Sequence, residues 1–282
     1  MTTTIAILAP GAMGAGIGLR LVEGGATVLT NLEGRSAPSR ARAEQAGMRE
    51  APLAALAEAD LVLSIVPPGE AVALAQRLAP ALEAGRRKPV FVDANAVSPA
   101  TVARVAAALA GTGAAVVDGC IIGAPPGPRG KSPALYVSGD PGGLTEPLRR
   151  HGLDLKVMDA PFGAASGLKL AYAMCTKGVT AMAAGMLLGA ARNEVGPALR
   201  VELERSQPEL LARFGKAMPD MLPKAYRWIA EMREIAAFMG PDDPAAMMFE
   251  GAARVYERLA ADRAGSRALS ETLLAAVRER SS

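Results

Sequence analysis

Short apolar segments rich in Ile, Val and Leu alternate with Ala-rich helical segments from residue 4 to about residue 158. This alternation predicts a parallel β-sheet covered by helices. The early apolar segments are hydrophobic throughout instead of alternating with polar residues, so we expect both faces of the sheet to be buried. The predicted strands are Thr4–Leu8, Thr27–Thr30, Leu61–Val66, Val90–Asp93, Ala115–Ile121, Ala134–Ser138 and Leu155–Met158.

The strand pattern ends at Pro161, and the rest of the chain has apolar residues at helical spacing. The segment from Ser166 to Arg192 is predicted to form one long helix. Asp243 and Pro244 are typical of a helix start, because Asp caps free backbone amides and Pro fits the first turn. We therefore predict an α/β domain over residues 1–160 and an all-α domain over residues 161–282. The helices of the second domain are expected to break at Pro197, Pro208, Pro219, Pro223, Pro241 and Pro244.

The charge, the apolar stretches and the numbers of Cys and His exclude several classes of protein. The 282 residues carry 31 Lys plus Arg against 28 Asp plus Glu, a formal net charge of +3, and no long basic run, so we expect no nucleic-acid partner. No apolar stretch of membrane-spanning length is free of charge or glycine, and no basic signal segment is seen, so we expect a cytoplasmic protein without a membrane partner. Two Cys and one His argue against a metal site or a Ser-His-Asp triad.

The segment IAILAPGAMGAGIGLRLVEGG places an apolar strand directly before a glycine turn and an amphipathic helix. In the dinucleotide fingerprint, three glycines after the strand allow close backbone approach to the pyrophosphate at a helix N-terminus. In this register Ala9 replaces the first glycine, and Gly11 and Gly14 are the other two. With Ala12 and Met13 between them, they predict an α/β Rossmann domain that binds a dinucleotide, followed by the all-α domain.

The end of the second predicted strand bears on the choice between NAD and NADP. An acidic residue near position 31 would hold the ribose 2′-hydroxyl of NAD, but Asn31 is found there. Arg35, Ser36 and Arg40 follow, and a guanidinium is suited to a 2′-phosphate. We therefore predict NADP. In the alternative interpretation both arginines are solvated and Glu33 binds the ribose.

Other cofactor contacts are expected where strands end at the carboxyl edge of the sheet, since open α/β sheets bind ligands there. Val66 ends one predicted strand, Pro67 follows it, and Asn95 comes shortly after the end of the next. Arg129 or Lys131, in the loop GAPPGPRGKSP, could hold a substrate carboxylate, although a solvated loop is the simpler interpretation.

Several motifs together resemble the β-hydroxyacid dehydrogenase superfamily, which includes 6-phosphogluconate and 3-hydroxyisobutyrate dehydrogenases. The branch with its own C-terminal helical domain is the most similar. The motifs are APGAMG (9–14), SIVPP (64–68), DANAVSP (93–99), DGCIIGAPP (118–126), GAASGLKLAYAMCTKG (163–178) and AYRWIAEMREIA (225–236).

The resemblance implies a catalytic lysine on a helix behind a glycine-rich approach, which matches Lys169. Members usually have asparagine one turn later, where this chain has Tyr172 and Ala173. Members also bind the substrate carboxylate through a serine and two glycines after the sixth strand. The matching positions here, Ile122, Gly123 and Ala124, lack the serine. The resemblance further implies a homodimer formed through the helical domain.

Hydride transfer between an alcohol and nicotinamide needs a group that takes or returns the hydroxyl proton. The single His lies in a polar stretch, so Lys169 is the better candidate, and Lys177 is expected to help lower its pKa. On a helix Tyr172 and Thr176 share a face with Lys169. Tyr172 is therefore a second catalytic candidate, and Thr176 a substrate contact or a helix residue bonded to its own backbone.

Glu231 lies in an otherwise apolar helix and is expected either to line the substrate cleft or to belong to the helix's polar face. Together these features predict an NADP-dependent oxidoreductase that acts on a small hydroxy acid or its keto or semialdehyde form. A reductase of imines or non-acidic ketones is the alternative within enzymes, and a silent NADP-binding regulator is the alternative outside them.

Overall fold

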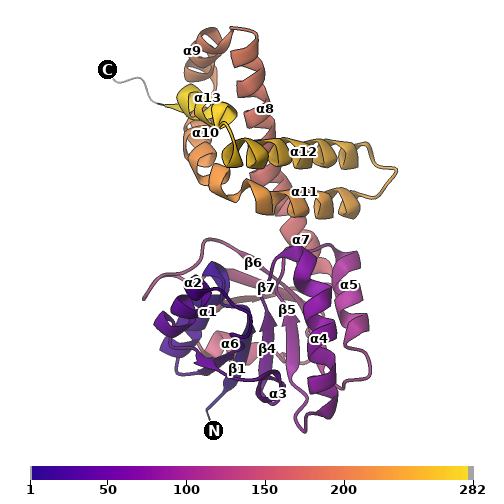
Figure 1. The fold of residues 1–282 in the computed structure, drawn as a ribbon. Helices are drawn as coiled ribbons and strands as arrows, with labels where there is room; N and C mark the ends of the chain where they lie inside the picture. The colour runs from indigo at the N-terminus through magenta and orange to yellow at the C-terminus, as the bar shows by residue number, and fades with distance from the viewer. Residues whose placement is uncertain (1, 279–282) are drawn as a thin grey trace. The chain divides into compact units, whose positions relative to one another are not determined.

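Eight strands form one sheet within residues 2–278, the part of the chain that the computed structural model describes (Figure 1). Their order is β3-β2-β1-β4-β5-β6-β7-β8, which includes the 3-2-1-4-5-6 order of doubly wound dinucleotide-binding folds. The strands are β1 (Thr4–Leu8), β2 (Thr27–Thr30), β3 (Arg49–Glu50), β4 (Leu61–Ser64), β5 (Val90–Asp93), β6 (Ala115–Ile122), β7 (Ala134–Ser138) and β8 (Asp154–Val157).

The sheet is parallel except between β6 and β7, which pair antiparallel. The prediction of a parallel sheet is wrong at this pair. A parallel connection needs a crossover, usually through a helix, whereas the residues between β6 and β7, from Gly123 to Pro133, form a loop without one. The strand β3 was not predicted, because its two residues are charged and exposed and give no hydrophobic signal.

Helices cover both faces of the sheet, as predicted. On β1, Ile5 and Ile7 belong to one buried cluster with residues of α1 (Ala12–Glu23), α2 (Ala37–Gln45) and α6 (Glu146–Arg150). Ala6 and Leu8, which alternate with them, belong to the opposite cluster. That cluster includes residues of α3 (Leu53–Leu56), α4 (Ala71–Ala84) and α5 (Pro99–Ala108), and the 3₁₀ turn η1 (Pro68–Glu70) precedes α4.

The rest of the described chain is helical, which confirms the predicted order of a Rossmann domain and an all-α region. The chain divides into two compact units inside α7, between Lys169 and Leu170. The elements are α7 (Ala164–Ala173), the π-helical turn η2 (Met174–Gly178), α8 (Val179–Arg192), α9 (Gly196–Ser206), α10 (Pro208–Met221), the 3₁₀ turn η3 (Leu222–Lys224), α11 (Ala225–Met239), α12 (Pro244–Ala264) and α13 (Ala268–Val277).

Two features of the helical region concern the predicted helix ends. Asp243 caps α12, and its carboxylate accepts a hydrogen bond of 2.8 Å from the Ala245 amide, as predicted. Pro219 was expected to break a helix but lies inside α10. It falls in the last turn, where one backbone bond is lost, and the fully buried Met218 and Met221 hold that turn in the core.

The continuous helical segment Ala164–Arg192 is long and apolar enough to cross a membrane by length and composition. The core helix of a soluble protein meets the same criterion, and 44% of the most apolar part of this segment is buried within the protein. The segment is therefore weak support for a membrane span.

Candidate functional site

The glycine turn joins β1 to α1 and brings the helix N-terminus close to the strand. The Ala9 amide donates to the Ile65 carbonyl (3.1 Å), and the Gly11 amide donates to the Ala9 carbonyl (2.8 Å). A Cβ atom at Gly14 would lie 2.1 Å from the Ala9 carbonyl oxygen, so only glycine fits there. Gly11 caps α1 without a side chain, and Ala12 and Met13 begin the first turn, whose amides have no partner within the helix. These residues fit a pyrophosphate.

The end of β2 shows where the predicted specificity residues lie. Asn31 is buried, and its side-chain amide donates to the Ala51 carbonyl (3.2 Å). Ser36 precedes α2 as its N-cap and contacts Ser39 (3.2 Å), and Arg35 is half-buried beside it. Asn31 therefore holds the turn after β3, whereas Arg35 and Ser36 stand at the start of α2.

Arg40 is more constrained than the sequence suggests. Its guanidinium donates to the Leu32 carbonyl (2.6 Å) and lies 3.7 Å from the Glu50 carboxylate. Glu33 and Glu50 both line a shallow pocket at this corner, together with Asn31, Ala51, Pro52 and Leu53. Part of the positive charge of Arg40 is thus already balanced by Glu50.

Arg42 was not predicted. Its Nε atom donates to the Pro10 carbonyl in the glycine turn (3.4 Å), and Nη2 donates to Ser39 (3.0 Å). This places a guanidinium of α2 beside the phosphate-binding turn. No local pattern separates Arg42 from its neighbouring arginines, because the contact depends on how α2 packs.

Asn95 links the ends of β4 and β5. Its Oδ1 atom accepts from the Val66 amide (2.6 Å), and its Nδ2 atom donates to the Ser64 hydroxyl (2.8 Å) and to Asp93 Oδ2 (2.9 Å). Both donor hydrogens of the amide are therefore used within the chain. Asn95 holds Val66, and with it Pro67, at the carboxyl edge of the sheet. A direct contact of Asn95 with the cofactor stays a prediction.

Lys169 lies at the same edge of the sheet. Its Nζ atom donates to the carbonyl of Ile121 near the end of β6 (2.6 Å). Ile122, Gly123 and Ala124 follow, with Gly123 at φ 137°, a backbone conformation that favours glycine. The neighbouring thiol of Cys120 is fully buried, and burial raises its pKa to about 12, so it is not a nucleophile.

The connecting loop after β6 packs on α1. A Cβ atom at Gly16 would lie 2.7 Å from Pro126 Cδ, and the Arg129 amide donates to Glu23 (3.1 Å). Arg129 and Lys131 are both exposed. Their side chains agree with the solvated interpretation of this loop.

The predicted residues of the helical unit have partners of their own. Tyr172 is half-exposed, and the Thr176 hydroxyl donates to the backbone carbonyls of Tyr172 (3.3 Å) and Ala173 (3.4 Å). Glu231 forms an ion pair with Lys177. The Lys177 ammonium is thus paired with a carboxylate, and the expectation that it lowers the pKa of Lys169 stays a prediction.

The π-helical turn after Tyr172 is held by side chains that bind its carbonyls. Arg213 donates to the Cys175 carbonyl (2.6 Å), Thr180 to that of Thr176 (2.8 Å), and the buried Tyr256 to that of Lys177. Three successive carbonyls are therefore satisfied outside the helix ladder, which explains how this turn is tolerated. Lys177 lies in this π-helical turn, and its side chain forms the ion pair with Glu231.

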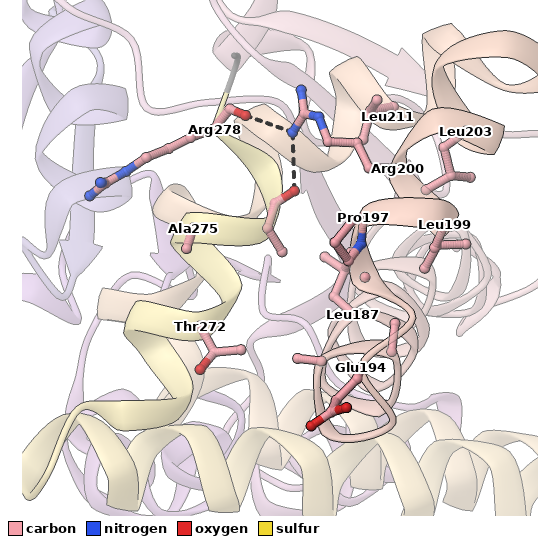
Figure 2. Close-up of a pocket in the computed structure, with 14 residues that line it drawn as sticks. Leu187, Glu194, Pro197, Leu199, Arg200, Leu203, Leu211, Thr272, Ala275 and Arg278 are labelled. Atoms are coloured by element: carbon pink, nitrogen blue, oxygen red, sulfur yellow. Dashed lines mark hydrogen bonds between the residues drawn. The ribbon is translucent and has the colours of Figure 1, made fainter. Parts of the chain in front are cut away.

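A cavity of about 630 Å³ lies within the helical unit, between α8, α9 and α13 (Figure 2). Its walls are mainly apolar and include Leu187, Leu199 and Leu203. The Arg200 guanidinium closes one side by donating to the carbonyls of Ala276 (3.2 Å) and Arg278 (2.6 Å). None of the predicted site residues lines this cavity, so it is separate from the candidate site. Among residues 2–278, no group of three or more His, Cys, Asp or Glu side chains is placed to hold a metal ion.

Solved structures share the fold over nearly the whole chain. A conserved hypothetical protein from Sinorhizobium meliloti 1021 has a TM-score of 0.69 and 25% identity over 98% of this chain and 97% of its own. A conserved protein of unknown function, similar in structure to 3-hydroxyacid dehydrogenases, has a TM-score of 0.67 and 25% identity over 93% of this chain and 98% of its own. A 3-hydroxyisobutyrate dehydrogenase from Mycobacterium tuberculosis, solved with L-serine, has a TM-score of 0.68 and 22% identity over 97% and 99%.

Among curated proteins, none is significantly similar to this chain in sequence. Two family models match it. One is described as a domain of unknown function (DUF1932) and matches residues 190–259. The other is described as the NAD binding domain of 6-phosphogluconate dehydrogenase and matches residues 4–146, just over half of the chain. The predicted class, an NAD(P)-dependent oxidoreductase, agrees with both the second model and the shared fold. The chain therefore belongs to the family that carries the NAD-binding domain of 6-phosphogluconate dehydrogenase, within the β-hydroxyacid dehydrogenase superfamily.

Proposed function

We propose that this protein is an NADP-dependent oxidoreductase that interconverts a small hydroxy acid and its keto or semialdehyde form. The observation that carries the proposal is the position of Lys169, whose Nζ atom is held at the carboxyl end of β6 by the Ile121 carbonyl. The glycine turn and the Val66–Pro67 segment stand at the same edge of the sheet. A proton-carrying group and a dinucleotide cradle are thus built into one edge.

The glycine turn fits the pyrophosphate, and the end of β2 favours the 2′-phosphate of NADP. No carboxylate follows β2 directly, since Asn31 occupies that place and is bonded to Ala51. Arg35 and Ser36, at the N-terminus of α2, offer a guanidinium, a hydroxyl and helix amides, all of which suit a phosphate. Glu50 opposes this preference by pairing with Arg40.

The proton chemistry is assigned to Lys169. When bound, the nicotinamide donates or accepts the hydride. The Lys169 ammonium gives a proton to the carbonyl oxygen of the substrate as that oxygen becomes a hydroxyl, and takes the proton back in the reverse direction. While still protonated, it also stabilises the negative charge that develops on this oxygen. Tyr172 is the further candidate for a hydrogen bond to substrate.

A second candidate function is the reduction of imines or non-acidic ketones. The observation that favours it is the segment after β6, where Ile122, Gly123 and Ala124 offer no side-chain hydrogen-bond donor to a carboxylate. Any acid group of the substrate would have to be held by backbone amides or by residues outside this segment. A silent NADP-binding regulator is the third alternative, and the presence of Lys169 weighs against it.

A panel of substrates separates these alternatives. The protein is mixed with NADP⁺ or NAD⁺ and 3-hydroxy acids, or with NADPH or NADH and semialdehydes, neutral ketones, or ketone and amine pairs. Reduction or oxidation of the cofactor is followed by absorbance. Turnover of the acids supports the main proposal, and turnover of neutral ketones or imines alone supports the second. Tight NADPH binding without turnover of any compound would favour the regulator.

We further propose a cytoplasmic homodimer that binds a small-molecule substrate and neither nucleic acid nor membranes. Exposed apolar side chains of the helical unit, including Met182 on α8 and Met247 and Met248 on α12, support an assembly surface there. Sedimentation equilibrium of the wild type and of Met182→Glu would test the dimer. A monomeric wild type would contradict it.

A further inference from the structure

The first turn of α7 is capped by side chains from the sheet. The amides at the start of a helix lack partners within the helix and need acceptors from elsewhere. The Ala165 amide donates to Ser138 Oγ (3.0 Å), and the Ser166 amide donates to Asp118 Oδ2 (3.0 Å). Asp118 on β6 and Ser138 on β7 are direct cross-strand partners. The two strands therefore present one composite acceptor to the helix.

Asp118 is fully buried and bonded on both carboxylate oxygens. Oδ2 accepts from Ser138 Oγ (2.9 Å) as well as from the Ser166 amide, and Oδ1 accepts from Ser166 Oγ (2.5 Å). Burying a carboxylate is costly unless donors surround it, and the N-terminus of α7 adds favourable partial positive charge. The geometry of this turn is thus fixed by three donors that converge on one side chain.

The next turn of α7 carries Lys169. Ser166 and Lys169 are three residues apart and lie on neighbouring positions of one helix face. Along β6, Asp118 binds Ser166, and Ile121, three residues further, accepts from Lys169 Nζ (2.6 Å). One strand therefore holds the helix at two successive points, once through the Asp118 carboxylate and once through a backbone carbonyl.

We propose that Asp118 is a positioning residue, which fixes the first turn of α7 so that the Lys169 Nζ atom stands at the carboxyl edge of β6. This inference rests on the proposed function, since the position of Lys169 matters to the reaction only if Lys169 moves the proton. Asp118 does not touch the reacting atoms. Its effect is on the direction of the lysine, and small misplacements of a reacting group lower rates strongly.

The chain contains a matched control for a purely structural role. Asp262, also buried, accepts from the Leu269 amide (3.0 Å), the Ser270 amide (2.9 Å) and Ser270 Oγ (2.7 Å) at the start of α13. It caps a helix as Asp118 does, but α13 carries no lysine. Loss of either carboxylate should weaken a helix start, and only loss of Asp118 should displace Lys169.

The test compares Asp118→Asn with Asp262→Asn in the full chain. Lysines are labelled by reductive ¹³C-methylation, and the Lys169 resonance is assigned from its absence in Lys169→Arg. We expect the Lys169 resonance to shift in Asp118→Asn and to stay in place in Asp262→Asn. With any substrate that is turned over, kcat should fall about tenfold or more in Asp118→Asn, with NADPH affinity within about twofold of wild type. Both variants should lose thermal stability.

An unmoved Lys169 resonance in Asp118→Asn, or an equal fall in kcat in both variants, would overturn the inference. If Asp118→Asn does not fold, Ser166→Ala is used instead, because this substitution removes the Oγ bond to Asp118 and keeps the amide bond. The Lys169 resonance should again shift and kcat should again fall more than in Asp262→Asn. An unmoved resonance or an equal fall in kcat would again overturn the inference. The two proposals fail separately. Full turnover in Lys169→Ala would end the proposed proton role, whereas the resonance would still show whether Asp118 positions the lysine.

Discussion

The Nζ atom of Lys169 donates a hydrogen bond of 2.6 Å to the carbonyl oxygen of Ile121, next to the last residue of β6. This bond gives the flexible four-carbon side chain a fixed direction at the carboxyl edge of the sheet. The Lys169 ammonium is therefore held at the edge of the sheet where β1 and β4 also end.

Removing the Lys169 amine should lower turnover by about 10²–10⁴-fold in Lys169→Ala, the range for a positioned acid–base group. Lys169→Arg should be nearly as slow, because a guanidinium keeps the charge but does not release its proton near neutral pH. NADPH affinity should change little in both. The measurement is steady-state kinetics with any substrate found in the panel, after circular dichroism has shown native folding.

Tyr172→Phe supplies the comparison for these variants. Tyr172 is half-exposed and lies on the helix face of Lys169, so loss of its hydroxyl should cost less than loss of the amine. Near-wild-type turnover in Lys169→Arg would show that the residue serves as a fixed charge only. Near-wild-type turnover in Lys169→Ala would remove it from the chemistry.

The glycine turn allows a second test with two alanine substitutions. A Cβ at Gly14 would lie 2.1 Å from the Ala9 carbonyl oxygen, whereas a Cβ at Gly11 meets nothing within 4 Å. Gly14→Ala should therefore push α1 away from β1, even though alanine normally stabilises a helix interior by about 1 kcal/mol. Gly11→Ala is the control for folding without cofactor, where it should show only a small loss at the helix cap. Thermal shift without NADPH compares the two variants, and thermal shift with saturating NADPH compares Gly14→Ala with the wild type. Full stabilisation of Gly14→Ala by NADPH would show that this register of the turn is wrong.

The strands β1, β4 and β5 were predictable because each is a short apolar segment that is bounded by turn residues and buried on both faces. β3 was not, since Arg49 and Glu50 join the sheet through backbone bonds to β2 that leave no trace in hydrophobicity. The direction of β7 was also missed, because antiparallel pairing depends on the absence of a helix between Gly123 and Pro133.

The side chains of the candidate site were also only partly predictable from the sequence. The glycine turn could be predicted because its chemistry is local. Asn95 was expected to reach a ligand, and its side-chain donor hydrogens are bound by Asp93 and Ser64. Ser64 comes near Asn95 only after β4 and β5 pair. Glu231 pairs with Lys177, which is 54 residues away in sequence. Residue type therefore identified polar groups, and only the tertiary contacts show which of them are already occupied.

Cofactor choice should depend on the arginines after β2. We expect NADPH to bind at least about tenfold more tightly than NADH, a difference of about 1.4 kcal/mol. Arg35→Ala should reduce this ratio, because a charge-assisted contact to the 2′-phosphate is lost. Glu50→Gln should increase it, because Glu50 lies 3.7 Å from the Arg40 guanidinium and balances part of its charge.

Calorimetric titration of both cofactors measures these ratios. Arg87→Ala is a suitable control, since Arg87 pairs with Asp60 at the other end of β4 and should leave the ratio unchanged. Equal affinities for the two cofactors in the wild type, or an unchanged ratio in Arg35→Ala, would contradict the NADP assignment.

The last prediction concerns the buried Asp93 and pH. The pKa of its carboxyl is raised to about 6, mainly because the group is buried. The negative charge of the nearby Asp118 also raises this pKa, whereas the hydrogen bonds from the backbone and side-chain amides of Asn95 lower it. In the unfolded chain the pKa is about 3.9. Between about pH 4 and pH 6 the folded protein therefore binds this proton more strongly than the unfolded chain does. The free energy of unfolding falls as the pH rises through this window.

Asp93→Asn should abolish this dependence, because the amide is of similar shape and does not ionise. The free energy of unfolding of Asp93→Asn minus that of the wild type should rise as the pH increases from about 4 to about 6, by on the order of 2 kcal/mol, and stay level above it. Urea denaturation at a series of pH values gives this difference. Asp154→Asn, at an exposed strand position, is the control and should give a small difference at every pH. A difference for Asp93→Asn that is constant with pH, or that falls as the pH rises, would show that Asp93 ionises at least as readily in the folded protein as in the unfolded chain.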